Sequence, residues 1–87
     1  MSFSLSPDVS VTDTDDGMVL LDEATGRYWQ LNSTGAFVLR ALLAGSGPRE
    51  AARGLGERHP GLGAERAATD VAALIASLHA ARLVVTG

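Results

Sequence analysis

The stretch GMVLLDEATGRYWQLNSTGAFVLRALL, residues 17–43, decides the fold, because strand, turn, strand and helix signals follow one another in it. Met18–Asp22 is a compact apolar run with the length of a strand. The next four residues end in Gly26, which suits a turn position with positive φ. Arg27–Leu31 is rich in aromatic residues, which favour strands. The pattern predicts a hairpin that leads directly into a helix.

A further strand is predicted on the N-terminal side of this hairpin. Val9–Thr12 is a short extended segment, and the polar residues 13–17 after it form a turn. Three consecutive strands joined by short turns predict an antiparallel meander in the order 1-2-3. The third strand, Arg27–Leu31, then lies at an edge of the sheet.

Three helices are predicted on the C-terminal side. The first follows the N-cap candidates of residues 32–34 and ends at Gly45, and the second runs from Pro48 to about Arg58. The third, from about Ala64 to about Ala81, is the most regular, and its apolar residues recur at helical spacing. This apolar face consists of Ala67, Val71, Leu74, Ile75 and Leu78. Residues 83–85 read as a short extended tail. We therefore expect a single α+β domain over residues 1–87, a three-stranded antiparallel meander followed by three helices, similar to a winged helix.

Composition narrows the classes of function. The chain has 87 residues, 46% hydrophobic content and a formal net charge of −3, and all seven of its basic residues are Arg. An acidic chain without a clustered basic patch is a poor candidate for binding nucleic acid. It has no Cys, which excludes disulfides and thiolate chemistry. The sequence offers no membrane span and no secretory signal, so we expect a cytoplasmic protein with no membrane partner.

Candidate catalytic and metal-binding residues are few. His59 precedes a Pro-Gly turn and His79 lies near the end of the last helix, so both are expected at the surface. The acidic segment 13–17 does not match a calcium loop, because position five is Gly17 and position twelve is Ala24. No nucleophile elbow and no phosphate-binding loop is present. We expect no enzyme activity, no cofactor and no metal.

The helices raise the alternative of a DNA-binding winged helix. The recognition helix of such a fold carries basic or amide side chains toward bases and phosphates. Residues 69–77 of the last predicted helix, TDVAALIAS, are small, apolar and slightly acidic. This surface makes DNA binding the weaker hypothesis.

The exposed edge of the sheet is the better candidate for a binding site. Arg27–Leu31 contains no Pro and one charge, which is the profile of an edge that accepts another strand. Alternation places Trp29 and Leu31 on one face and Tyr28 and Gln30 on the other. On the last helix, small and polar residues flank the inward stripe and leave a groove beside the strand. The flanking residues are Ala67, Asp70, Leu74 and Ser77.

An ordered set of short motifs resembles the PqqD-like family of peptide-recognition domains. The set runs from Gly17–Asp22 through Thr25–Asn32 to Thr34-Gly35, and ends with Asp70-Val71 followed by Leu74, Leu78 and Leu83. Together the motifs cover nearly the whole chain. The segment LLDEATGRYWQLNSTG looks most like the stand-alone versions found in actinobacterial lasso-peptide gene clusters.

The resemblance implies a recognition element for ribosomally made, post-translationally modified peptides (RiPPs). Such domains bind the leader segment of a precursor as a strand added to the third strand, in a groove against the third helix. The implied partners are the leader peptide, a cysteine-type leader peptidase and an ATP-dependent macrolactam synthetase. The residues expected to bind the leader are Arg27, Tyr28, Trp29, Gln30, Leu31, Ala67, Asp70, Val71, Leu74 and Ser77. A peptide chaperone for a radical-SAM enzyme is the related alternative, and the edge strand could also pair with itself in a homodimer.

Overall fold

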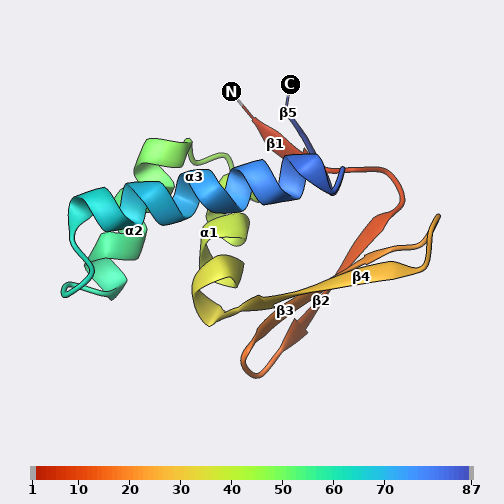
Figure 1. The fold of residues 1–87 in the computed structure, drawn as a ribbon, viewed down its shortest axis with the longest axis horizontal. Helices are drawn as coiled ribbons and strands as arrows, with labels where there is room; N and C mark the ends of the chain where they lie inside the picture. The colour runs from red at the N-terminus through yellow and green to blue at the C-terminus, as the bar shows by residue number, and fades with distance from the viewer. Residues whose placement is uncertain (1, 87) are drawn as a thin grey trace.

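The computed structural model describes residues 2–86, which form five strands and three helices (Figure 1). The elements in chain order are β1 (Phe3–Leu5), β2 (Val9–Thr14), β3 (Gly17–Asp22), β4 (Arg27–Asn32), α1 (Ser33–Leu43), α2 (Pro48–Arg58), α3 (Ala64–Ala80) and β5 (Val84–Thr86). The predicted α+β class, a meander followed by three helices, is confirmed.

The larger sheet is antiparallel with the strand order β2-β3-β4, so β4 lies at an edge as predicted. Leu20 of β3 faces Trp29 of β4, and Gly17 faces Asn32 at the end of the pair. The turn between these strands needs Gly26, whose φ of 76° lies in the left-handed region. Its N–H donates to the carbonyl of Asp22 over 2.8 Å, which closes the turn.

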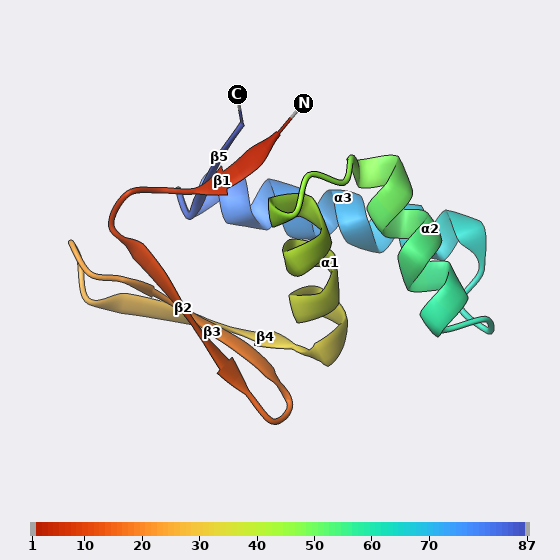
Figure 2. The same cartoon turned by 180° about the vertical axis from the view of Figure 1, so that it is seen from behind.

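A second, two-stranded sheet was not predicted. Residues 84 and 85 of the expected tail belong to β5, which pairs antiparallel with β1, with Phe3 opposite Thr86. Ser6 extends this contact, because its N–H donates to the carbonyl of Leu83 over 2.9 Å and its hydroxyl donates to that of Arg82 over 2.7 Å. The two ends of the described chain therefore lie side by side, which both ribbon views show (Figures 1 and 2).

The core forms around α1, which packs against β1, β3, β4 and α2. Leu20, Leu39, Leu55 and Leu83 are fully buried there, and they come from four different segments of the chain. The helix begins directly after β4, where the Asn32 side chain accepts a hydrogen bond from the N–H of Gly35 over 2.8 Å. β4 and the core helix are thus joined without a loop, which holds the edge strand in a defined place. No helix in the described part of the chain has the length and apolar character to cross a membrane.

Candidate functional site

The edge strand β4 presents two different faces. Trp29 and Leu31 are half-buried against the core, whereas Tyr28 and Gln30 are exposed, as their alternation predicts. Tyr28 is 69% exposed, the largest value among the large hydrophobic residues of the described chain. Within residues 2–86, only β3 pairs with β4, so one side of the β4 backbone is open to a further strand.

Asp70 and Leu74 of α3 form one wall of a hollow that also includes Asn32 of β4, whereas Ser77 does not line it. Asp70, Leu74 and Ser77 are spaced so that they share one face of the helix. Asp70 and Leu74 are half-buried and Ser77 is exposed. Asp70 lies 4.0 Å from the guanidinium of Arg66, measured from Oδ1 to Nε, as an exposed i,i+4 ion pair.

The structure separates two other predicted site residues from this wall. Ala67 and Val71 are each only 1% exposed and belong to the core cluster. They turn toward the interior because they lie on the same helical face as Leu78, another core residue. We expect them to support the wall from behind, since little of their surface is free to contact a ligand.

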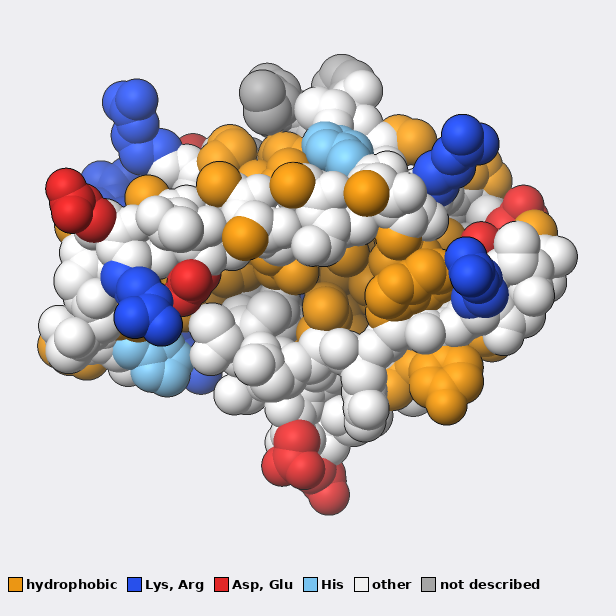
Figure 3. Space-filling model, in the orientation of Figure 1, with side chains coloured by type: hydrophobic (Ala, Val, Ile, Leu, Met, Phe, Trp, Pro, Cys, Tyr) orange, Lys and Arg blue, Asp and Glu red, His pale blue; other side chains and the backbone are white. Residues whose placement is uncertain are grey.

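A trough lies between β4 and α3. β4 packs on α1 and β3, while α3 packs on α2 and β5, so the two walls stand apart. Figure 3 shows hydrophobic side chains gathered in the hollow below α3. One end of the trough is a hollow of about 250 Å³, lined by Asn32, Thr34, Gly35, Val38, Leu55, Asp70, Ala73 and Leu74.

Several of these lining residues were missed in the sequence. Asn32 is the last residue of β4 and Thr34 lies in the first turn of α1, and both were interpreted as helix-capping candidates. Their position at the end of the strand could have indicated the site. Val38 and Leu55 are core residues whose contribution to the hollow depends on tertiary packing, so no local pattern in the sequence marks them.

The rim of the trough carries charges of both signs. Arg58 and His59, at the end of α2, line an adjoining hollow that shares Asn32, Thr34 and Asp70 with the first. The guanidinium carbon of Arg58 lies 4.7 Å from the centre of the Phe37 ring, a cation–π contact that anchors the side chain there. A ligand in the trough would therefore meet an apolar floor and a mixed polar rim.

His79 lies away from the trough. Its ring stacks on Phe3 at a centroid distance of 6.0 Å, and its Nε2 lies 2.7 Å from the Thr86 hydroxyl oxygen. His79 thus holds the β1–β5 pair against α3. Within residues 2–86, no three side chains of the kinds that bind metals come together.

Comparisons with known proteins agree with this geometry. The model of the family "Coenzyme PQQ synthesis protein D (PqqD)" matches residues 17–84. A lasso peptide synthetase B1, solved in complex with the leader peptide, is 40% identical with a TM-score of 0.91, and the match covers 99% of this chain and 100% of that one. TbiB1, solved in complex with the TbiA(β) leader peptide, is 24% identical with a TM-score of 0.83, covers 97% and 94%, and shows the shared fold. No curated protein matches the sequence significantly.

Proposed function

The chain belongs to the PqqD family, and from that premise we propose that it binds the leader segment of a ribosomally made precursor peptide, in particular that of a lasso peptide. The 40% identical relative is a lasso peptide synthetase B1 complexed with the leader peptide, which supports this assignment. The leader adds as a strand to β4 and lies in the trough against α3.

One observation carries the proposal: the outer edge of β4, which no strand of the described chain pairs with, borders an apolar trough. Main-chain hydrogen bonds along β4 attach the peptide, and each contributes only about 0.5–1.5 kcal/mol net. They do not distinguish one sequence from another, because every peptide offers the same groups. Each large apolar leader side chain buried in the trough adds about 1.5–3 kcal/mol, and these side chains select the sequence.

We propose that the chain recognises the precursor and leaves its chemistry to partner enzymes. It has no Cys, and its two histidines are placed at the rim of the trough and against Phe3. The partners are a leader peptidase and a macrolactam synthetase, to which the bound precursor is presented. The purified chain should leave the precursor intact, with or without ATP and divalent metal, and mass spectrometry of the peptide after incubation would check this.

The family name favours one alternative, a peptide chaperone for a radical-SAM enzyme of cofactor synthesis. The genes beside this one would discriminate between the two pathways. A neighbouring leader peptidase and an asparagine-synthetase-like cyclase indicate a lasso peptide, whereas a radical-SAM gene indicates the alternative.

Leu74→Asp tests the trough. The change places a charge among apolar side chains, so we expect labelled leader peptide to bind at least tenfold more weakly in a fluorescence titration. Leu74 also contacts the core, so circular dichroism must first show that the variant is folded. Ala73→Glu provides a second test, because Ala73 lines the same hollow but is exposed, and its substitution does not disturb the core.

Two control variants change residues that lie outside the trough. Ala72→Glu changes the neighbouring residue of the same type, which is also exposed but lies outside the trough. Arg49→Ala removes a charge from α2, outside the residues that line the trough. Neither should change leader affinity by more than about twofold. If folded Leu74→Asp and Ala73→Glu bind like the parent, or if Arg49→Ala abolishes binding, strand addition at β4 is wrong.

A further inference from the structure

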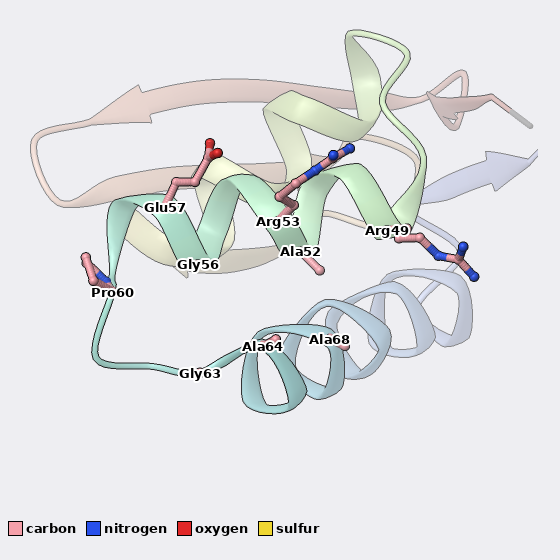
Figure 4. A pocket seen from close by; sticks show the side chains of 9 residues that line it. All are labelled: Arg49, Ala52, Arg53, Gly56, Glu57, Pro60, Gly63, Ala64 and Ala68. Atoms are coloured by element: carbon pink, nitrogen blue, oxygen red, sulfur yellow. The ribbon is translucent and has the colours of Figure 1, made fainter.

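A second groove runs between α2 and α3. It consists of two hollows of about 460 and 570 Å³ that share Arg49, Ala52 and Ala68. Figure 4 shows Ala52 of α2 and Ala68 of α3 pointing toward one another across it. Both hollows are larger than the 250 Å³ hollow of the trough. The 250 Å³ hollow of the trough shares no lining residue with this groove, and the hollow that adjoins it shares only Pro60.

The groove and the trough occupy nearly opposite faces of α3. Ala68, Ala72 and Ala76 line the groove, whereas Asp70, Ala73 and Leu74 line the trough. At 3.6 residues per turn the centres of the two sets are roughly 155° apart around the helix axis. A molecule bound on one side therefore leaves the other side accessible.

The shape of the groove suits a helix. From Ala64 to His79 it follows α3 for about 22 Å, or roughly four turns. Its floor is made of small side chains, and Ile75 adds a half-buried apolar surface near one end. Small side chains allow the backbone of a docked helix to approach closely, as in helix-in-groove recognition.

The charged residues of α2 that line the groove are Arg49, Arg53 and Glu57, so positive charge is in excess there. Arg49 and Arg53 are exposed and line the groove, and within residues 2–86 the ion pairs are Arg40–Asp13 and Arg66–Asp70. Neither of the two groove arginines therefore has a carboxylate partner. Arg49 also lies in the first turn of α2, where the helix dipole disfavours a cation. Arg49 therefore does not stabilise the helix through its charge, and its guanidinium is available to an anionic partner.

A second copy of the chain fits this charge pattern poorly. A twofold dimer through the groove would bring the arginines of both copies to the same interface, where like charges repel. A copy docked through its own acidic surface would form an open-ended chain instead of a closed dimer. The occupant is better sought in another protein.

We propose that the groove between α2 and α3 docks an amphipathic helix of the leader peptidase, whose small apolar face is flanked by Asp or Glu side chains that meet Arg49 and Arg53. This inference rests on the proposed function, because it names how a processing enzyme reaches the leader-bound chain. The leader then occupies one side of α3 and the enzyme the other.

The test measures two affinities for each variant of the full chain. The probes are labelled leader peptide and the purified leader peptidase encoded beside the precursor gene, titrated separately. The double variant Arg49→Glu/Arg53→Glu and the single variant Ala72→Glu should each bind the peptidase at least tenfold more weakly and keep leader affinity within twofold. Ala73→Glu should show the opposite pattern. Arg82→Glu, an exposed charge reversal outside both surfaces, should change neither affinity.

The peptidase titration decides the inference and the leader titration decides the proposed function. Peptidase binding that is absent in the parent, or unchanged in both groove variants, overturns the docking groove while leaving the leader site in place. Leader binding that is absent in the parent, with peptidase binding sensitive to the groove variants, overturns the proposed function alone. Parallel loss of both affinities in the folded groove variants would show one shared surface and overturn the separation of the two sites.

Discussion

At the scale of single residues, Gly17 shows how tightly β3 and β4 meet. A Cβ atom at this position would lie 2.0 Å from the carbonyl oxygen of Leu31, in the backbone of the neighbouring strand. No rotamer can relieve such a contact, because the backbone fixes the position of a Cβ atom and the oxygen belongs to the main chain. Gly17 is therefore required where β4 turns into the cap of α1, beside the floor of the trough.

Gly17→Ala should destabilise the protein by about 1–3 kcal/mol, because the two strands must separate to admit the methyl group. At about 4–8 °C per kcal/mol for a domain of this size, thermal unfolding should begin at a clearly lower temperature. Gly56→Ala is the matched control: it lies within α2 with open space around its position, so Ala should stabilise the helix by about 0.5–1 kcal/mol. A melting temperature of Gly17→Ala equal to that of the parent would contradict the close contact.

Residue patterns predicted the face of a side chain better than its exposure. Alternation along Arg27–Leu31 placed Trp29 and Leu31 on one face, and in the structure both are half-buried against the core. The same reasoning grouped Ala67 with Asp70 and Leu74, although Ala67 is buried. Small residues fit both a core and a groove, so the identity of Ala67 cannot decide between them; the position of the neighbouring elements does.

At the scale of elements, the three-stranded sheet has two open edges, β2 and β4, and only β4 faces α3 across a trough. On β2, Asp13 forms an ion pair with Arg40 of α1. Charges on an edge strand disfavour pairing with a further strand. The meander alone therefore does not select the binding edge; the position of the helices does.

Hydrogen exchange should reveal which edge binds the leader. Amides of β4 that are open in the free chain should exchange more slowly when leader peptide is added at saturating concentration, because a new strand protects them. Amides of β2 should keep the exchange rates of the free chain and serve as the internal reference. Protection confined to β2, or absent from both strands, would place the peptide elsewhere.

The pairing of β1 with β5 lay beyond sequence analysis. Each strand has three residues, too few for alternation to be recognised, and the partners lie at opposite ends of the chain. The helices and the meander were predictable because their signals are local, such as the caps at Asn32 and Pro48 and the turn at Gly26. Pairing between distant segments depends on where α1 and α3 bring them.

At the scale of the whole molecule, α3 separates two surfaces and supports both. One face contributes to the trough and the nearly opposite face to the groove with α2, while a third, with Ala67, Val71 and Leu78, packs into the core. A helix buried on one face and exposed on two others suits a protein that holds a peptide and an enzyme together.

The overall charge leads to a prediction about nucleic acid. With a formal net charge of −3 and a pI of about 5.1, the molecule should repel duplex DNA. We expect no shifted band in a gel assay at low salt, where electrostatic binding is strongest. If a shifted band appears at low salt and disappears as the salt concentration is raised, the winged-helix regulator becomes a hypothesis again.

The pairing of β1 with β5 has a practical consequence for building larger proteins. Because the described chain enters and leaves through neighbouring strands, residues 2–86 could be inserted into a surface loop of a host enzyme with little separation between the two junctions. Such a graft would occupy the end of the molecule held by Phe3 and His79, and the strand edge at β4 would stay open. The fold thus lends itself to use as a portable adaptor that brings a tagged peptide to whatever catalyst carries it.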